Sequence, residues 1–334
     1  MKPIKVGVIG VGRMGKHHCR VYSSLRQVEF VGLYDVDART ADEVAQRYEV
    51  ASFSTVEELL DRVDAVSVTT PTPCHFDIVT SCLNRSIHVL VEKPFTETLE
   101  QAEILTRAVD DSQAVVQVGH IERFNPAFLE LKNVLETMPV LAMNFRRLSP
   151  FQGSNKDVDV VLDLMIHDLD LVLDLFGEQP RSMSAYGLIV MSNTLDHAVA
   201  QLSYAPQPLI SITASRITEQ KIRSIEVTVG DAFLEVDLLN KNILIHRRSV
   251  GEYLNQNHHA VKYHQESIVE RILVPNSEPL LLEIQHFLDC IVNHKPSRVG
   301  AQEGLRSLHL ALEIRELISE YEGHQVIISS ALNN

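Results

Sequence analysis

The stretch Val6-Gly7-Val8-Ile9-Gly10-Val11-Gly12-Arg13-Met14-Gly15 decides the fold. An apolar strand runs into Gly10-x-Gly12-x-x-Gly15, and a helix-forming segment follows. Glycines at this spacing allow a tight turn, a close approach of the backbone to a pyrophosphate and close packing of the helix on the strand. The helix N-terminus offers free N–H groups and a positive dipole end to the phosphates. The stretch therefore predicts a dinucleotide-binding turn that includes Arg13 and Met14.

An acidic residue at the end of the next strand narrows the choice of dinucleotide. Residues 4–9 and 28–34 are both typical of buried strands, and Asp35 ends the second one. An acid about twenty residues after the last glycine accepts a hydrogen bond from the adenosine ribose 2′-hydroxyl. It would repel a 2′-phosphate, so NAD is favoured over NADP. Binding of S-adenosylmethionine is the alternative for such a turn, and Asp35 alone would also suit an ordinary strand end.

Length and charge limit the class of protein. A chain of 334 residues is long enough for two domains, each with its own core. The formal net charge of −14 argues against non-specific binding to nucleic acid and against docking on an anionic membrane. It leaves open a small anionic ligand, because a local site can be positive on an acidic protein.

Cysteine usage and the N-terminus predict a cytoplasmic protein. Cys19, Cys74, Cys82 and Cys290 are scattered without the spacing of a structural zinc site, and a disulfide framework is not expected. The sequence enters its first strand directly, which leaves no room for a signal peptide. No apolar run reaches the length that a bilayer requires.

The first third of the chain alternates between strand and helix patterns. Further strands are expected at 51–53, 65–69, 87–91 and 115–118, with helices at 38–48, 76–83 and 99–109 and a helix start at Ser54 or Thr55. This alternation predicts a doubly wound parallel sheet with helices on both faces. Residues 1–121 are expected to form an NAD-binding Rossmann domain.

The rest of the chain has a different pattern. Strands are expected at 141–148, 181–190, 198–204, 209–215, 225–229, 233–237 and 243–246, and helices at 126–136, 158–176, 280–293 and 301–322. Successive strands without intervening helices indicate a large, mostly antiparallel open sheet in an α+β domain. Residues 122–334 are predicted to form this domain, for substrate binding and oligomerisation. Residues 251–264, rich in Asn, Gln and His, are expected to form a surface loop or a poorly ordered excursion.

Three polar residues, Lys93, Asp163 and His167, occupy positions where a catalytic role is possible. Lys93 follows the predicted strand at 87–91, and ligands of open α/β sheets bind at the carboxyl ends of strands. Asp163 and His167 are four residues apart in an apolar segment, so a helix would place them on one face. A solvated loop lysine and a hydrogen-bonded core pair are the structural alternatives. No third ligand is placed for a metal, and no metal is expected.

Four motifs together resemble the glucose–fructose oxidoreductase / inositol dehydrogenase (Gfo/Idh/MocA) family. They are the glycine motif, Thr70-Pro71-Thr72-Pro73-Cys74-His75, Glu92-Lys93-Pro94 and Asp163-Leu-Met-Ile-His167-Asp168-Leu-Asp170. The resemblance covers nearly the whole chain. It implies cofactor contacts from Thr70, Pro71, Thr72, His75, Glu92 and Lys93. It also implies a catalytic group of Lys93, Asp163 and His167, in which His167 accepts the hydroxyl proton.

A further segment narrows the resemblance within the family. Gly119-His120-Ile121-Glu122-Arg123-Phe124-Asn125-Pro126 is similar to members that oxidise nucleotide-activated amino sugars. The resemblance implies substrate contacts from Glu122, Arg123 and Asn125 besides Lys93, Asp163 and His167. Arg123 would suit a diphosphate because arginine donates in bidentate fashion, and a structural salt bridge is its alternative role.

The expected activity is NAD-dependent oxidation of a sugar ring hydroxyl to a ketone, at C3 of UDP-N-acetylglucosamine or a related nucleotide sugar. A dehydrogenase of a free polyol or hexose is the second hypothesis, and a non-catalytic sensor of NAD or sugar is the third. The resemblance also implies a homodimer or homotetramer formed through the sheet. Neither a nucleic acid nor a membrane is an expected partner.

Overall fold

The computed structural model describes residues 3–151, 158–205, 207–253 and 262–320. The chain divides into two compact units. Unit 1 consists of Met1–Phe124 and Ser277–His309, and unit 2 of Asn125–Asn276 and Leu310–Asn334. The helix α9 (Ala301–Glu320) contributes its first part to unit 1 and its second part to unit 2.

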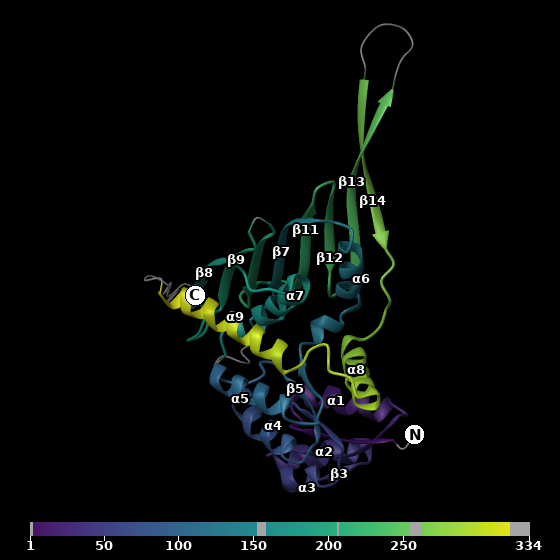
Figure 1. Ribbon diagram of the computed structural model, residues 1–334, viewed down its shortest axis with the longest axis vertical. Helices are drawn as coiled ribbons and strands as arrows, with labels where there is room; N and C mark the ends of the chain where they lie inside the picture. The colour runs from purple at the N-terminus through teal and green to yellow at the C-terminus, as the bar shows by residue number, and fades with distance from the viewer. Residues whose placement is uncertain (1–2, 152–157, 206, 254–261, 321–334) are drawn as a thin grey trace, which may run out of the picture. The chain divides into compact units, whose positions relative to one another are not determined.

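A parallel sheet forms the centre of unit 1 (Figure 1). Its strands lie in the order β3-β2-β1-β4-β5-β6, and every neighbouring pair is parallel. The strands are β1 (Ile4–Ile9), β2 (Val28–Tyr34), β3 (Ala51–Ser52), β4 (Ala65–Val68), β5 (His88–Glu92) and β6 (Val116–Gly119). This order confirms the predicted Rossmann sheet. The order in which the strands are added to the sheet reverses between β1 and β4, while the strands themselves stay parallel. The loops after these two strands therefore lie where such sheets bind ligands.

The helices of unit 1 begin at the residues that local chemistry favours. They are α1 (Arg13–Ser24), α2 (Ala38–Tyr48), α3 (Val56–Leu60), η1 (Thr72–Cys74), α4 (His75–Leu83), α5 (Leu99–Asp110), η2 (Ile121–Phe124) and α8 (Pro279–Asn293). The side chain of Asp37 accepts a hydrogen bond from the backbone N–H of Arg39 at the start of α2. Thr55 accepts one from Glu58 in the same way, as the sequence predicts for α3.

The helix α8 packs in the core of unit 1 although it follows unit 2 in sequence. Its buried residues Leu280, Ile284 and Phe287 belong to the same cluster as Val6 and Val8 of β1. The division by contacts therefore differs from the predicted one, which assigned every residue after 121 to the second domain. An apolar helical stripe shows that a helix is buried, but it does not show which sheet buries it.

A mixed sheet forms unit 2 (Figure 1). Its strand order is β14-β13-β12-β11-β7-β10-β9-β8, and only the neighbours β7 and β10 run parallel. The strands are β7 (Val140–Leu148), β8 (Ser182–Leu188), β9 (His197–Ser203), β10 (Leu209–Ser215), β11 (Ile222–Val229), β12 (Ala232–Asp237), β13 (Asn242–Tyr253) and β14 (Lys262–Ile272). The predicted large, mostly antiparallel sheet is confirmed.

Helices cover one face of this sheet, as Figure 1 shows. They are α6 (Pro126–Leu135), the π-helical turn η3 (Val161–Met165), α7 (Ile166–Phe176) and the second part of α9. On β10, Ile210 and Ile212 face the helices and are fully buried, whereas Leu209 is 56% exposed. This alternation places one face of the sheet in the core, and the described residues of unit 2 place no helix over the other face.

The predicted surface loop at 251–264 is wrong at both ends. The strand β13 continues to Tyr253 and β14 begins at Lys262, while residues 254–261 lie outside the described chain. Antiparallel pairing satisfies backbone N–H and C=O groups whatever the side chains are, so a polar hairpin can extend beyond the hydrophobic pattern of a sheet. For the same reason β14 was not predicted.

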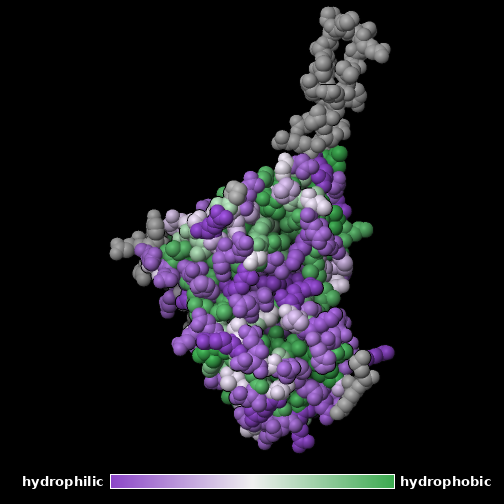
Figure 2. All heavy atoms as spheres, viewed as in Figure 1, coloured by the Kyte–Doolittle hydropathy of each residue, from purple (hydrophilic) through white to green (hydrophobic). Residues whose placement is uncertain are grey.

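Hydrophilic side chains cover much of the molecular face drawn in Figure 2, with smaller hydrophobic areas between them. Among the described residues, no helix has both the length and the apolar character needed to cross a membrane.

A buried ion pair anchors the segment that enters η3. Asp196 is fully buried and accepts hydrogen bonds from the backbone N–H groups of Val190 (2.8 Å) and Met191 (2.6 Å). Arg216 donates from Nε to Asp196 at 2.7 Å and from Nη1 to the carbonyl of Val158 at 2.7 Å. Burial raises the pKa of Asp196, but these donors outweigh burial and lower the pKa to about 2.

Replacement of Asp196 by asparagine should therefore destabilise unit 2 near neutral pH by about 2 kcal/mol. A carboxyl with a lowered pKa stabilises the fold above its unfolded-state pKa and loses this contribution as the pH falls toward about 2. The difference between wild type and Asp196→Asn should shrink on acidification. Urea unfolding followed by circular dichroism at neutral and acidic pH measures it, with exposed Asp231→Asn as the control. A difference that is the same at both pH values would contradict the expectation.

Candidate active site

The glycine turn after β1 requires glycine at two positions. Gly10 has a φ of +85°, a conformation that other residues adopt only with strain. A Cβ atom on Gly15 would lie 2.0 Å from the carbonyl oxygen of Gly10. A Cβ on Gly12 would meet nothing within 4 Å, so the backbone is open at this point. Gly12 is the N-cap of α1 and provides no side-chain cap, which leaves the first N–H groups of the helix available to an anion.

Asp35 lies against this turn, as its spacing predicts. Its Oδ2 atom accepts a hydrogen bond from the backbone N–H of Val11 at 2.6 Å, and its Oδ1 atom accepts one from Asp37 at 2.9 Å. The carboxylate therefore belongs to the same loop cluster as Gly10 and Gly12. Each oxygen has a second lone pair that can accept a ribose hydroxyl.

The loop after β4 completes the cluster. Thr69 donates from Oγ1 to the carbonyl of Gly10, a contact that the sequence analysis missed. The position of Thr69 at the end of an apolar strand, beside the Thr70-Pro71 motif, was the available signal. Thr70 Oγ1 is buried and has no hydrogen-bond partner among the described residues. The predicted residues Pro71 and Thr72 follow at the start of η1.

These features fit a dinucleotide. The open backbone at Gly12, the free helix N-terminus of α1 and the buried hydroxyl of Thr70 are what a bound pyrophosphate would use. Arg13 and Met14 form the first turn of α1, where Arg13 is exposed. The structure thus brings together the predicted cofactor residues of β1, β2 and β4.

The Glu92-Lys93-Pro94 turn lies at the carboxyl end of β5, where the sequence predicts it. Lys93 is half-buried. The two ring nitrogens of His75 lie 3.0 Å from the carbonyl oxygens of Pro94 and Thr70, so His75 links this turn to the loop after β4. Burial lowers the pKa of His75, although both carbonyl contacts oppose the effect. The imidazole is therefore a buried link between two loops, and its predicted cofactor contact stays a prediction.

Three further polar side chains are linked to Glu92, directly in the case of His18 and through His18 in the case of Ser67 and Tyr22. His18 Nε2 lies 3.2 Å from Glu92 Oε1, and His18 Nδ1 lies 2.9 Å from Ser67 Oγ. Tyr22 OH lies 2.8 Å from the same Ser67 oxygen. The sequence analysis missed all three. The signal was present for Ser67, which interrupts the apolar strand Ala65-Val66-Ser67-Val68.

Unit 2 contains the other two predicted catalytic residues. Asp163 lies in the π-helical turn η3 and His167 in the first turn of α7, and both are half-buried. The side chain of Asp159 accepts hydrogen bonds from the N–H groups of Val161 (2.9 Å) and Leu162 (3.1 Å), which holds the start of this turn. A π-helical turn was not predicted, and such turns occur frequently at functional sites.

A buried ion pair lies beside His167 in the sequence. Arg147 on β7 donates to both carboxylate oxygens of Asp168, with Nη2 at 2.7 Å from Oδ1. The two side chains are only 2% and 3% exposed. A paired carboxylate in this position fixes one face of α7 against β7.

The predicted substrate residues of the 119–126 segment are buried. Glu122 and Arg123 lie in η2 of unit 1 and are 3% and 4% exposed. Asn125 caps α6 in unit 2, where it accepts from Ala127 at 3.1 Å and donates to the carbonyl of Leu238 at 3.0 Å. Asn125 thus has a structural role that the sequence did not reveal. Substrate contacts of these three residues stay predictions.

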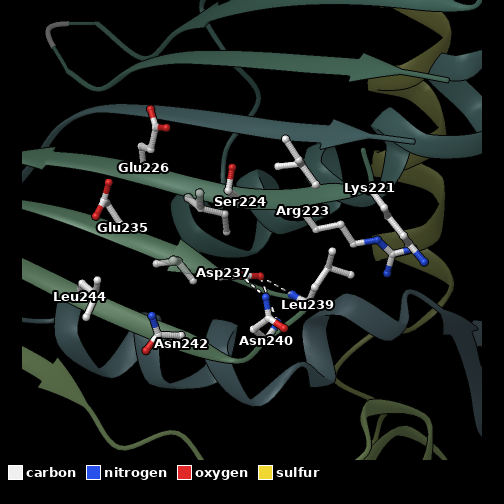
Figure 3. A pocket seen from close by; sticks show the side chains of 13 residues that line it. Lys221, Arg223, Ser224, Glu226, Glu235, Asp237, Leu239, Asn240, Asn242 and Leu244 are labelled. Carbon is white, nitrogen blue, oxygen red and sulfur yellow. Dashed lines mark hydrogen bonds between the residues drawn. The ribbon is translucent and has the colours of Figure 1, made fainter. Parts of the chain in front are cut away.

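A hollow on the sheet of unit 2 lies apart from the predicted residues (Figure 3). Outward-facing side chains of β11, β12 and β13 line it, among them Ser224, Glu226, Glu235 and Asp237. Asp237 accepts hydrogen bonds here from the N–H groups of Leu239 and Asn240. None of the predicted site residues lines this hollow. In the described chain, no group of three or more His, Cys, Asp or Glu side chains is placed to hold a metal ion.

The fold and the loops of unit 1 define a Rossmann-fold oxidoreductase that uses a dinucleotide. The family description "Oxidoreductase family, NAD-binding Rossmann fold" matches residues 4–120, and its partner, "Oxidoreductase family, C-terminal alpha/beta domain", matches residues 145–320. The chain belongs to the Gfo/Idh/MocA oxidoreductase family, as its motifs indicated. It is an NAD-dependent oxidoreductase that acts on CH–OH groups.

Two curated relatives illustrate the range of the family. UDP-N-acetylglucosamine 3-dehydrogenase of Acidithiobacillus ferrooxidans is 32% identical over 318 residues, which cover 95% of this chain and 98% of that protein. The scyllo-inositol 2-dehydrogenase (NAD(+)) of Bacillus subtilis is 25% identical over 312 residues, 87% of each chain.

Solved structures agree with this assignment. A structure of the Acidithiobacillus ferrooxidans enzyme has a TM-score of 0.86, with 96% of this chain and 99% of that chain covered at 32% identity. The scyllo-inositol dehydrogenase of Lactobacillus casei with bound NAD(H) and scyllo-inositol has a TM-score of 0.78 at 19% identity, covering 96% and 98% of the chains. The second likeness shows the shared fold.

Replacement of Gly15 by alanine should weaken NAD binding by about tenfold or more, because the added Cβ would force α1 away from the Gly10 carbonyl. Isothermal titration with NAD measures the loss. Gly230→Ala is the matched control, since a Cβ on Gly230 would meet nothing within 4 Å. Wild-type NAD affinity in folded Gly15→Ala would show that the close approach is not required.

Proposed function

We propose that this oxidoreductase oxidises a ring hydroxyl of a nucleotide sugar to a ketone, at C3 of UDP-N-acetylglucosamine or a related compound. The observation that carries the proposal is Lys93, which stands at the carboxyl end of β5 on the NAD-binding sheet while Asp163 and His167 are retained in unit 2. The similarity to UDP-N-acetylglucosamine 3-dehydrogenase extends over nearly all of both chains and supports this substrate class.

Each residue has a chemical role in this proposal. NAD, when bound, accepts the hydride from the ring carbon. Lys93 donates a hydrogen bond to the oxygen on which negative charge develops. His167 accepts the hydroxyl proton, because a neutral imidazole is a base near neutral pH. Asp163, four residues earlier, orients the imidazole and balances its positive charge.

Substitution of either Lys93 or His167 by alanine should lower turnover by about a hundredfold or more, since each removes a proton-transfer or charge-stabilising group. NAD affinity should stay within about threefold of wild type, because neither residue lies in the glycine turn. Formation of reduced nicotinamide, followed by absorbance, measures turnover, and calorimetry measures binding. Glu103→Gln, an exposed carboxylate on α5, is the control. Normal turnover in both alanine variants would overturn the roles assigned here.

A substrate panel separates the proposal from its alternatives. UDP-N-acetylglucosamine, other UDP-sugars, inositols and free hexoses are each offered with NAD, and a preference for the UDP-sugars is expected. A preference for an inositol or a hexose would favour the polyol or hexose dehydrogenase. NAD binding without turnover on any of these compounds would favour a sensor.

We also propose that the enzyme is a homodimer or homotetramer that forms through the face of the unit 2 sheet opposite its helices. This face carries short polar side chains such as Ser211 and Thr213 on the central strand β10. The side chain of Asn144 on β7 donates to Glu226 on β11 at 3.0 Å, so the polar groups of the face are partly satisfied within it. A face whose polar groups are partly satisfied within it can pack against a second copy of the chain.

An arginine in the middle of this face should oppose association, because its charge and length would be buried between two copies. Light scattering after size exclusion is expected to give a multimer for wild type and a smaller mass for Ser211→Arg. Glu103→Arg on unit 1 should keep the wild-type mass. A monomeric wild type, or an unchanged mass for Ser211→Arg, would exclude this interface.

A further inference from the structure

A chain of four polar side chains runs beneath the NAD-binding loops of unit 1. It passes from Tyr22 on α1 through Ser67 on β4 and His18 on α1 to Glu92 at the end of β5, with contacts of 2.8, 2.9 and 3.2 Å. Tyr22, Ser67 and His18 are at most 1% exposed, and the side chain of Glu92 is 13% exposed. Buried polar groups of this kind must satisfy one another.

The carboxylate end fixes the direction of every hydrogen bond. An ionised Glu92 only accepts, so His18 donates from Nε2. In a neutral imidazole Nδ1 then accepts from Ser67, and Ser67 accepts from Tyr22. Burial raises the pKa of Tyr22, while its bond to Ser67 opposes the effect, so Tyr22 stays a phenol that donates. Each proton in the chain has one acceptor when Glu92 is negative.

Glu92 stays negative in spite of its burial. Burial alone raises the pKa of Glu92, but the hydrogen bond from His18, the attraction of Lys93 and the backbone N–H of Lys93 together lower the pKa below its usual value. A Cβ on Gly119 would lie 3.1 Å from Glu92 Oε2, so the backbone of β6 confines the carboxylate. The negative charge of Glu92 also acts to raise the pKa of His75, against the effect of burial.

The carboxylate acts on Lys93 in two ways. Glu92 Oε2 accepts a hydrogen bond from the backbone N–H of Lys93 at 3.3 Å, which orients the turn. The attraction between Glu92 and Lys93 is mutual, so a negative Glu92 also stabilises the ammonium form of the lysine. Only the ammonium form carries the positive charge that neutralises a developing alkoxide.

We propose that His18 and Glu92 are positioning residues that keep Lys93 charged and oriented, and that they couple Lys93 to the helix of the glycine turn. His18 lies on α1, whose first turn would face the phosphates of a bound cofactor, and Glu92 directly precedes the lysine. One buried contact therefore joins the cofactor helix to the lysine turn. The proposal rests on the role of Lys93 in the proposed function.

The first test measures Lys93 itself and needs no substrate. Acetic anhydride acylates only the neutral amine, so labelling of Lys93 over a pH range, read by mass spectrometry, gives the midpoint of its deprotonation. In Glu92→Gln this midpoint should fall by about one pH unit. At a pH below the midpoint, Lys93 of the variant should then react about tenfold faster than Lys93 of the wild type. Labelling of Lys5 is the internal reference, and Glu103→Gln should match wild type.

His18 variants test the pair without altering the carboxylate. His18→Leu fills the space but removes the hydrogen-bond donor to Glu92. The midpoint of Lys93 deprotonation should therefore fall in this variant, as in Glu92→Gln. His18→Gln retains an N–H donor and should restore much of the wild-type midpoint. The double variant His18→Leu/Glu92→Gln should resemble Glu92→Gln alone, because His18 acts through Glu92.

Kinetics provide the second readout. Glu92→Gln should lower kcat about tenfold or more and shift the basic limb of the kcat profile to lower pH. An unchanged Lys93 midpoint and pH profile in folded Glu92→Gln would overturn the inference. If that variant fails to fold, equal Lys93 midpoints in His18→Leu, His18→Gln and wild type would overturn it. A shifted midpoint together with an inactive wild type would reject the proposed function alone.

Discussion

The close approach of α1 to β1 at Gly15 is the constraint on which the rest of unit 1 depends. A Cβ at this position would lie 2.0 Å from the Gly10 carbonyl, so no larger residue permits the same packing. The approach points the helix N-terminus at the glycine turn. It also buries the face of α1 that carries His18 and Tyr22, one and two turns further along. Both side chains thereby come within hydrogen-bond distance of Ser67 on β4.

Charges buried in two ion pairs give unit 2 a fixed internal geometry. In unit 2, Arg147 pairs with Asp168, and Arg216 pairs with Asp196 at contacts of 2.7 Å. Such pairs add little net stability compared with apolar residues of the same shape, because desolvation opposes the attraction. Removal of one partner is costly, however, so each pair tolerates few alternative arrangements. Both pairs hold segments that border Asp163 or His167, where a catalytic group would need a defined position.

The sequence predicted those parts of the fold that local patterns determine. The bounds of β1, β2 and α2 were predicted as the structure has them, because apolar runs, the cap at Asp37 and the glycine turn act within a few residues. The sheet partner of α8 and the strand β14 were not predictable in this way. Their places depend on contacts between segments far apart in the chain, and the polar hairpin of β13 and β14 lacks the alternation that marks a half-buried strand.

The candidate site likewise contains residues that local sequence patterns predict and residues that only the fold brings together. The sequence predicted Gly10, Gly15, Asp35 and Lys93 as site residues because each comes soon after a strand, at a position with a stated chemistry. The chain from Tyr22 to Glu92 was not found, because its members are 45, 49 and 74 residues apart in sequence. Only the parallel sheet, which places β4 and β5 side by side under α1, brings them together.

The elements that bind the cofactor therefore also place the lysine. The helix α1 and the strands β4 and β5 form the dinucleotide fold, and the same three elements supply every member of the chain that ends at Glu92. Asp163 and His167 depend instead on anchors within unit 2, namely Asp159 and the Arg216–Asp196 pair. Because these two sets of anchors share no residue, the surroundings of Asp163 and His167 can vary while the support of Lys93 stays unchanged. Each set of anchors can therefore change in sequence without disturbing the residues that the other set holds.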